Sequence, residues 1–315
     1  MLEIGTVDYH TAGEPFRIVT GQELVGETIL AKRRDAAARL DHVRRLLVNE
    51  PRGHADMYGC FVTEPEDAGA DLGVVFFHNA GYSTACGHGT IALVTWALES
   101  GVLPVTAEET RVVVDVPSGR LETVARIRDG DVVSVRFRNV PAFVWGTAVL
   151  PGVDVAFGGA FYASLEERVA PGELPRLIAL GRELKHDLEA AQEFVHPLEP
   201  ELRDIYGVIF WQREGPNAQR NVTVFADGEV DRSPCGSGTS ARLALLDASG
   251  ELARGEELRH LSIVGSEFRG RVVGQVEVAG RPAVVTEVEG SAHRTGEHRF
   301  VLEDEDELGT GFLLR

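Results

Sequence analysis

Positive charge is scarce in this chain of 315 residues. It has 31 Lys and Arg against 49 Asp and Glu, which gives a formal net charge of −18, and its two lysines are Lys32 and Lys185. Phosphate binding requires clustered positive charge, and anionic membrane surfaces attract basic segments. We therefore expect neither a nucleic acid nor a membrane as a partner, and we interpret the acidity as a solvated surface.

Cysteines are few, and long apolar runs are lacking. Cys60, Cys86 and Cys235 are an odd, widely spaced set that does not resemble a disulfide framework, which indicates a reducing compartment. The segment Met1–Ile4 has no basic region followed by an apolar stretch, so no signal peptide is predicted. The run Leu72–Phe77 is far shorter than the ~18 residues that cross a bilayer and indicates a buried strand. We expect a cytoplasmic protein.

The overall composition is that of a folded chain of about two domains. Hydrophobic residues make up 43% and charged residues 25%, and at ~150 residues per domain the length allows two cores. Apolar spacing predicts helices over Ile29–Val48, with Arg44 among the residues of its polar side, and over Leu174–Val195. The remainder has mostly strand-like composition. The pattern therefore predicts an α+β architecture with few helices.

One segment of the chain occurs twice. The sequence Cys-Gly-His-Gly-Thr at 86–90 matches Cys-Gly-Ser-Gly-Thr at 235–239, an offset of 149 residues. At the same offset Val75-Phe76 matches Val224-Phe225, and Ser100-Gly101 matches Ser249-Gly250. Each half thus reads as a strand, a turn, the cysteine motif and a helix of about four turns closed by glycine. A period near half the chain length indicates duplication into two similar domains.

The repeated motif has physical consequences at the start of a helix. Its glycines let the backbone turn tightly and approach a ligand. The first N–H groups of a helix lack intrahelical partners and favour an anion such as a carboxylate. The same helix end favours thiolate over thiol, and cysteines so placed have pKa values of roughly 3.5–7.5. A single copy is nevertheless more typical of a buried structural cysteine.

Two copies favour a catalytic interpretation. If an approximate two-fold axis relates the halves, a cleft between them would carry a thiol on each side and helix ends that hold a carboxylate. Such a site could remove a proton from one face of a Cα and return one to the opposite face. Two lysines leave few places for a pyridoxal-type Schiff base. We predict a cofactor-free racemase or epimerase.

Four stretches of the chain carry a family resemblance: Glu50–His54, Cys86–Thr90, Phe157–Ala163 and Asp231–Thr239. They resemble the proline racemase family, which also includes 4-hydroxyproline 2-epimerases and trans-3-hydroxy-L-proline dehydratases, and the resemblance runs essentially end to end. It implies the fold shared with diaminopimelate epimerase: two pseudo-symmetric domains, each a curved mixed sheet around a central helix, with the active site in the inter-domain cleft. We expect residues 1–140 with 291–315 to form the domain carrying Cys86, and residues 141–290 the domain carrying Cys235.

The resemblance also implies roles for individual residues. Cys86 and Cys235 would be the two acid/base groups. Asp231 would receive the ring amine, assisted by the His88 side chain, and a cationic nitrogen does need such an acceptor. A turn residue is the alternative interpretation of Asp231. The substrate carboxylate would be held by the backbone N–H groups of Gly87, His88, Gly236 and Ser237.

The family offers three reactions. Its dehydratases usually carry threonine where this chain has Cys235, and inversion needs a proton delivered to the opposite face, so the intact pair favours racemase or epimerase chemistry. Many hydroxyproline epimerases have a histidine near the position of Ala218-Gln219, which this chain lacks. The sequence places 4-hydroxyproline epimerisation first, proline racemisation second and dehydration third.

Other readings of the sequence remain. Cys60 is expected to be a core thiol, and His54 is equally typical of a turn or of a substrate contact. No second Cys/His cluster has metal-ligand spacing, so we expect no metal and no cofactor. The expected partner is a small molecule, proline or hydroxyproline, and a homodimer is left open. A non-catalytic imino-acid-binding protein is the alternative outside enzymes, and a thiol peptidase is disfavoured because no His/Asn arrangement accompanies the cysteines.

Overall fold

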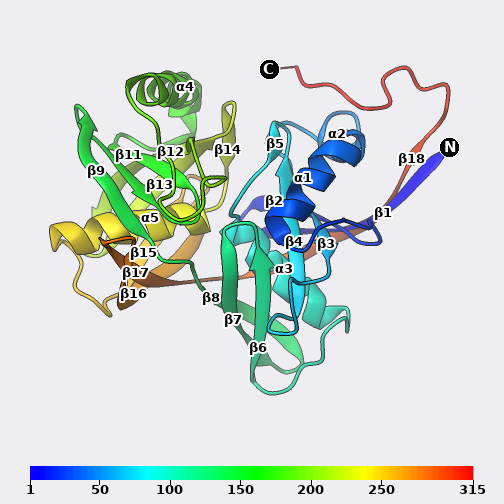
Figure 1. The fold of residues 1–315 in the computed structure, drawn as a ribbon, viewed down its shortest axis with the longest axis horizontal. Helices are drawn as coiled ribbons and strands as arrows, with labels where there is room; N and C mark the ends of the chain where they lie inside the picture. Colours follow the sequence, from blue (N-terminus) through cyan, green and yellow to red (C-terminus); the bar gives the residue numbers. More distant parts are fainter. Residues whose placement is uncertain (315) are drawn as a thin grey trace. The chain divides into compact units, whose positions relative to one another are not determined.

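The computed structural model describes residues 1–314, and the chain divides into two compact units (Figure 1). Unit 1 comprises Met1–Val135 together with the chain from Ser291 onward, and unit 2 comprises Arg136–Gly290. Strands predominate in both units and parallel and antiparallel pairings are mixed. The predicted α+β class with few helices is confirmed.

Within residues 1–314, unit 1 has eight strands and three helices, with a ninth strand, β8 (Asp131–Arg138), that runs across the division between the units. The helices are α1 (Ile29–Arg39), α2 (Asp41–Val48) and α3 (Gly87–Glu99). The strands are β1 (Leu2–Thr11), β2 (Glu14–Val19), β3 (Tyr58–Thr63), β4 (Leu72–His78), β5 (Gly81–Tyr82), β6 (Glu109–Val116), β7 (Gly119–Arg128) and β18 (Ala292–Leu302).

Unit 2 has a similar make-up. Its helices are the short 3₁₀ turn η1 (Pro171–Glu173), α4 (Leu174–Ala191) and α5 (Gly236–Ser249). Its strands are β9 (Phe143–Leu150), β10 (Val153–Phe157), β11 (Phe161–Glu166), β12 (Ile205–Gly215), β13 (Ala218–Phe225), β14 (Glu229–Asp231), β15 (Leu258–Ser262), β16 (Glu267–Val278) and β17 (Arg281–Gly290).

The order of strand pairing in unit 1 is repeated in unit 2. In unit 1 the pairs β1–β2, β3–β4 and β6–β7 are antiparallel, and β2–β3 and β4–β6 are parallel. In unit 2 the pairs β10–β11, β12–β13 and β15–β16 are antiparallel, and β11–β12 and β13–β15 are parallel. The five pairings follow one another in the same succession, so the repeat in the sequence corresponds to a repeat in the topology.

Each unit encloses one helix. All residues of Gly87–Leu98 in α3 and of Gly236–Leu246 in α5 are buried. Helix α3 contacts β1, β2, β3, β7 and β18, and α5 contacts β9, β10, β11, β16 and β17. A helix that is buried on all sides belongs to the interior of a core. Each sheet therefore curves around a central helix whose first residues carry the cysteine motif.

Two helices differ from the sequence-based expectation. The predicted helix Ile29–Val48 is two helices, because Leu40 leaves the helical conformation (φ −113°, ψ 10°) and α2 starts anew at Asp41. Arg44, expected on the polar side, is buried because its guanidinium donates to the carbonyl oxygens of His78 and Asn79. Helix α4 ends at Ala191 rather than at Val195.

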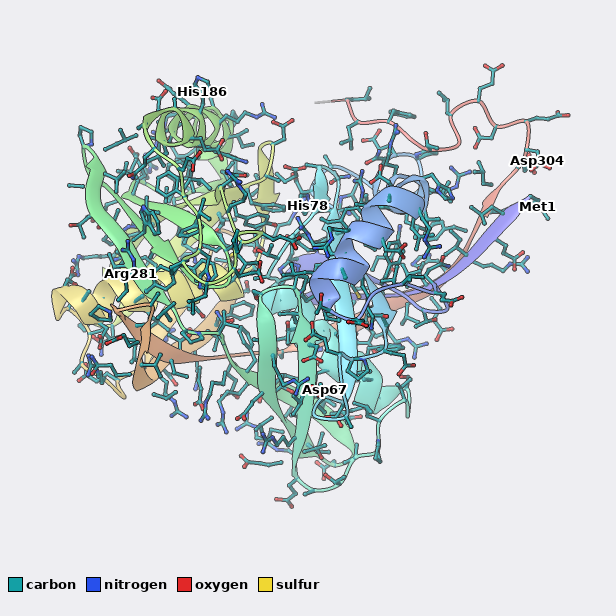
Figure 2. All side chains as sticks on the ribbon, viewed as in Figure 1. Met1, Asp67, His78, His186, Arg281 and Asp304 are labelled. Atoms are coloured by element: carbon teal, nitrogen blue, oxygen red, sulfur yellow. The ribbon has the colours of Figure 1, made fainter. Side chains whose placement is uncertain are left out.

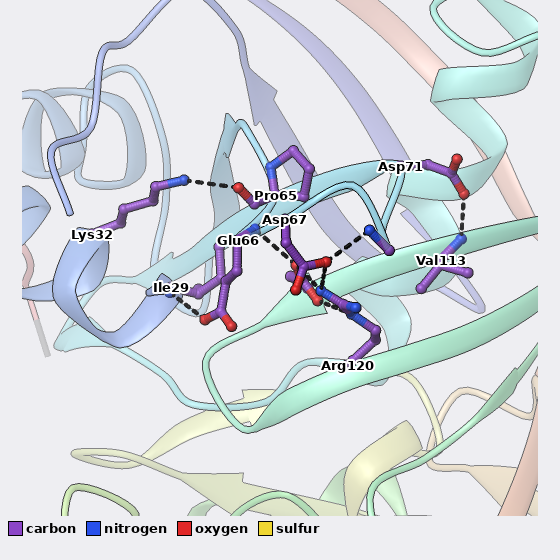
Figure 3. A network of polar contacts seen from close by, with 10 residues as sticks. Ile29, Lys32, Pro65, Glu66, Asp67, Asp71, Val113 and Arg120 are labelled. Atoms are coloured by element: carbon purple, nitrogen blue, oxygen red, sulfur yellow. Dashed lines mark hydrogen bonds and ion pairs between the residues drawn. The ribbon is translucent and has the colours of Figure 1, made fainter. Parts of the chain in front are cut away.

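Charged side chains cover the outside of the units, as Figure 2 shows; among the labelled ones, Asp67 and Asp304 are exposed. In unit 1 they also fix the loop between β3 and β4 (Figure 3). The Ile29 amide donates to Glu66 at 2.7 Å, and Arg120 pairs with Asp67 at 2.8 Å. The buried Lys32 ammonium donates to a carbonyl oxygen of the same loop at 2.5 Å. These contacts satisfy the start of α1 and a buried cation without involving either cysteine motif.

Among residues 1–314 no helix is both long and apolar enough to cross a bilayer.

Candidate active site

The first half of the candidate site lies at the start of α3, where Cys86 is the N-cap residue. Its Sγ accepts a hydrogen bond from the Gly89 amide at 3.2 Å. Gly89 must lack a side chain, since a Cβ there would lie 2.7 Å from Sγ of Cys86 and 2.4 Å from the ring of Phe16. The second glycine of the motif thus makes room for the sulfur over the helix end. A sulfur that accepts an N–H at this end of the helix dipole is in surroundings that suit a thiolate.

His88 is held beside this sulfur. Its ring nitrogens Nε2 and Nδ1 lie 3.4 and 3.6 Å from Sγ of Cys86. The ring packs edge-on against Tyr58 and Phe16, with centroids 4.9 and 5.7 Å away, and the His88 carbonyl accepts the Thr11 hydroxyl at 2.9 Å. The imidazole is buried and fixed in orientation, so it can act only on groups brought next to Cys86.

The second half of the candidate site lies at the start of α5. Cys235 has a left-handed backbone (φ +61°), which is unusual for a residue with a side chain. Its amide donates to the Ser233 hydroxyl at 3.0 Å, and the Ser233 amide donates to the Asp231 carboxylate at 2.8 Å. Asp231 therefore has the turn role that was the alternative interpretation of it. The turn also brings its charge close enough to the thiol to act on it electrostatically.

The Cys235 thiol is enclosed by hydroxyl groups. Its Sγ lies 3.8 Å from Oη of Tyr162 and 4.0 Å from Oγ of Ser237, and these two oxygens lie 2.6 Å apart. Burial, followed by the charge of Asp231, raises the pKa of Cys235 to about 12, while hydrogen bonds from Gly238, Tyr162 and Thr223 oppose the shift. The expectation that the helix end lowers the pKa is wrong for Cys235 in the ligand-free protein, because desolvation outweighs the helix dipole.

Tyr162 is the residue of this half-site to which the sequence assigned no role. It lies on β11, within the Phe157–Ala163 stretch that carries the family resemblance. Burial raises its pKa above the ordinary tyrosine value, so the phenol is neutral. Only the pairing of β11 with β12 and its packing against α5 bring the phenol to Cys235, and neither is visible in the spacing of the sequence. The family resemblance of the Phe157–Ala163 stretch was the available signal.

The structure thus gathers the expected residues into two groups. Cys86, Gly87 and His88 lie together in unit 1, and Asp231, Cys235, Gly236 and Ser237 lie together in unit 2. Gly87 and His88, like Gly236 and Ser237, are the first two residues of a buried helix, whose N–H groups have no carbonyl partners within that helix. Each group can therefore offer a thiol and amide donors to an anionic ligand.

Other candidates lie apart from these groups. Cys60, on β3, is completely buried, and burial raises its pKa. His54 is exposed, and its Nδ1 lies 2.7 Å from the neighbouring Ala55 carbonyl. Within the described part of the chain no three His, Cys, Asp or Glu side chains are grouped as metal ligands.

Comparison with known proteins identifies the family. The model of the family described as Proline racemase matches residues 6–313. The chain belongs to the proline racemase family. The structure of a probable proline racemase from Agrobacterium radiobacter, with bound carbonate, superposes with a TM-score of 0.92 at 29% identity and covers 99% of this chain and 96% of that one. The fold resemblance inferred from the sequence and the enzyme class, an isomerase, are confirmed at the level of the family.

Relatives in the proline racemase family carry several names. A protein named trans-3-hydroxy-L-proline dehydratase from Bacillus cereus is 45% identical over 325 residues, which cover 98% of this chain and 97% of that protein. A 3-hydroxyproline 2-epimerase from Burkholderia multivorans is 45% identical over 331 residues, covering 99% and 98%. A hydroxyproline epimerase from Agrobacterium vitis, solved with bound trans-4-hydroxy-L-proline, is 31% identical with a TM-score of 0.91, covering 99% and 96%. A phenazine biosynthesis protein of the PhzF family from Bacillus anthracis shares the fold alone. It is 13% identical, with a TM-score of 0.60, and the match covers 96% of this chain and all of that one.

Proposed function

We propose that this member of the proline racemase family is a two-base epimerase that inverts C2 of a 3-hydroxyproline without a cofactor. The observation that carries the proposal is the second thiol, Cys235, buried at the start of α5 in surroundings that keep it protonated. The sequence alone favoured 4-hydroxyproline. The relatives at 45% identity are named for 3-hydroxyproline, whereas the relative solved with trans-4-hydroxy-L-proline is 31% identical, so we rank 3-hydroxyproline first.

Inversion requires a base and an acid on opposite faces of the substrate. The Cys86 sulfur, as thiolate, would take the C2 proton, and the C–H electron pair would pass to C2 and into the carboxylate. The Cys235 thiol would then deliver its proton to the other face, leaving Cys86 protonated and Cys235 as thiolate. The reverse reaction exchanges the two roles. The burial that raises the pKa of Cys235 favours its thiol form and supports its use as the acid in this direction.

Carbanion formation also needs fixed electrostatic support. The N–H groups that begin α3 and α5, on Gly87, His88, Gly236 and Ser237, are suited to the carboxylate as negative charge develops on it. Asp231 is a carboxylate beside Cys235 and would receive the cationic ring nitrogen, and the His88 imidazole beside Cys86 would assist it. These assignments require both half-sites to act on the same substrate molecule.

Dehydration is the second candidate, because the Bacillus cereus relative is named for it. Elimination of the 3-hydroxyl needs a base at C2 and a proton for the departing hydroxyl, which leaves as water, but no proton delivered to C2 on the opposite face. Only inversion requires an acid such as the Cys235 thiol to protonate C2. This residue is therefore the reason that we place inversion ahead of elimination.

A panel of ring acids tests the proposal. The protein, with its cysteines reduced, is incubated in D₂O with the stereoisomers of 3-hydroxyproline, 4-hydroxyproline and proline, and C2 is followed by proton NMR. We expect fastest conversion of trans-3-hydroxy-L-proline to its C2 epimer. Loss of the 3-hydroxyl, detected as a cyclic imine, would favour dehydration. Pyrrole-2-carboxylate is a flat mimic of the carbanion. If the protein binds it but exchanges the C2 proton of no ring acid, the protein is a non-catalytic imino-acid-binding protein and the enzyme proposal is refuted.

A further inference from the structure

The two cysteines have chemically different neighbours although their motifs are repeats. Cys86 is next to an imidazole, at 3.4 Å from Nε2 of His88. Cys235 is next to two hydroxyls, those of Tyr162 and Ser237. Strands β2 and β11 occupy corresponding places in the order of pairing. The ring of Phe16 on β2 packs against His88, and the phenol of Tyr162 on β11 contacts Ser237. His88 and Ser237 occupy the same position in the two motifs. At this corresponding place the second half-site has a phenol where the first has the phenyl ring of Phe16.

The side chains of Cys235, Tyr162 and Ser237 form a connected set of hydrogen-bonding groups. The Tyr162–Ser237 pair is short, at 2.6 Å, and either oxygen can be the donor. All three side chains belong to buried residues, and an unsatisfied buried hydroxyl costs free energy. Each hydroxyl has one hydrogen to donate and lone pairs to accept with, so the set can satisfy itself in more than one arrangement.

Two arrangements match the two states of the sulfur. When Cys235 is a thiol, its S–H can donate to Oη of Tyr162 while the phenol donates to Oγ of Ser237. When Cys235 is a thiolate, the Ser237 hydroxyl can donate to Oη and the phenol can donate to the sulfur. Both hydroxyls rotate and neither ionises, and burial keeps the phenol neutral throughout. The groups acting on this sulfur also include the Asp231 carboxylate and the Thr223 hydroxyl.

We propose that Tyr162 is a positioning residue for Cys235, whose phenol remains hydrogen-bonded to the sulfur as thiol and as thiolate by exchanging donor and acceptor roles with Ser237. The change of state during turnover rests on the proposed two-base function. The placement of the sulfur by the phenol does not depend on that function, and the two can be tested separately.

The test compares Tyr162→Phe with Tyr206→Phe. Tyr206 is a matched control because its ring packs edge-on against that of Tyr162, at 5.7 Å between centroids. In each protein, alkylation of Cys235 by iodoacetamide is followed against pH by mass spectrometry of the peptide that contains it. Loss of a hydrogen bond to a charged sulfur should slow Cys235 alkylation about tenfold at a given pH and move its midpoint upward in Tyr162→Phe. The Tyr206→Phe and wild-type profiles should coincide.

A second readout covers turnover. With the preferred ring acid, Tyr162→Phe should lower kcat about tenfold with little change in KM. Ser237→Ala should also lower kcat. If Cys235 reacts too slowly to follow, the pH profile of kcat/KM replaces the alkylation profile. Its midpoint should move upward in Tyr162→Phe and stay at the wild-type value in Tyr206→Phe. An alkylation midpoint and a kcat equal to those of Tyr206→Phe would overturn the assignment. A shifted alkylation midpoint in a protein that inverts no ring acid would uphold the role of Tyr162 and refute the epimerase instead.

Discussion

At the residue scale, the three buried cysteines have different proposed tasks. Replacing Cys86 or Cys235 by serine would remove the proposed base or acid, because a hydroxyl is a far weaker acid than a thiol. We expect each variant to lower the rate of C2 inversion about 10²–10⁴-fold. Cys60→Ala is the matched control, since Cys60 is also buried but lies on β3, and it should keep nearly full activity. A fully active Cys235→Ser protein would refute the two-base mechanism.

Gly89 tests how closely the sulfur is held. An added methyl group would lie 2.7 Å from Sγ of Cys86 and 2.4 Å from Phe16, so Gly89→Ala must displace one of them. A displacement of about 1 Å in a reacting group can cost on the order of 100-fold in rate, and we expect a loss of that order in kcat. Gly172→Ala, where a methyl group meets no atom within 4 Å, should be silent. Equal kcat values for the two variants would contradict this geometry.

The sequence contained much of the information at this scale. The repeat marked Cys86 and Cys235 and their helix ends, because a motif that occurs twice at a fixed offset is visible without any structure. The hydrogen-bond set around Cys235 was not visible. Tyr162 is separated from Cys235 by 73 residues and reaches it only through the packing of β11 against α5. The pKa of Cys235 was also misjudged, because helix position can be read from sequence but burial cannot.

At the element scale, strongly patterned segments were predicted best. The helices after both motifs end near glycines with left-handed backbones, Gly101 and Gly250, as their positions indicated. The division of Ile29–Val48 at Leu40 was missed because both halves keep an apolar face across the break. The buried position of Arg44 was missed for a related reason. Besides the Asp41 carboxylate, its partners are the carbonyl oxygens of His78 and Asn79, and backbone acceptors leave no mark in a sequence.

The hydrogen bond between His260 on β15 and Thr239 on α5 leads to a prediction about how the free energy of unfolding depends on pH. His260 is fully buried, and its Nδ1 lies 2.8 Å from Oγ1 of Thr239. Burial, with a smaller contribution from Arg242, lowers its pKa to about 3. An unfolded histidine has a pKa of about 6.5, so as the pH falls below that value the unfolded state binds a proton that the folded state does not. This favours unfolding by about 2 kcal/mol at pH ~5, as an order of magnitude.

His260→Asn should remove that pH dependence while keeping a partner for Thr239. Urea unfolding at several pH values between about 7 and 5 measures it. The free energy of unfolding should fall more steeply toward acid in the wild-type protein than in the variant. Parallel curves would show that His260 does not titrate on unfolding.

At the scale of the whole molecule, the net charge of −18 is the feature that the function does not explain. Like charges repel within a compact chain, and added salt screens them. Salt also weakens surface ion pairs, but each of these contributes little. We expect Tm to rise by a few degrees when NaCl is raised from low to physiological concentration. A falling Tm would mean that the surface ion pairs outweigh the repulsion.

The duplication is the other whole-molecule feature, and here sequence and structure agree. The offset of 149 residues predicted two similar halves, and the two units share five strand pairings in the same succession around a buried helix. The halves nevertheless differ at their cysteines, with His88 beside one and Tyr162 beside the other. Duplication accounts for two thiols at matching positions, and these differences give each thiol its own acid–base surroundings.

The central claim is that C2 loses a proton to one thiol and gains one from the other. The most direct measurement is the early time course with trans-3-hydroxy-L-proline in D₂O, with substrate and epimer resolved by NMR. Two bases predict an epimer that carries deuterium at C2 while the remaining substrate still carries protium. Deuterium that enters the substrate before any epimer forms, or an epimer that retains the original protium, would contradict the account.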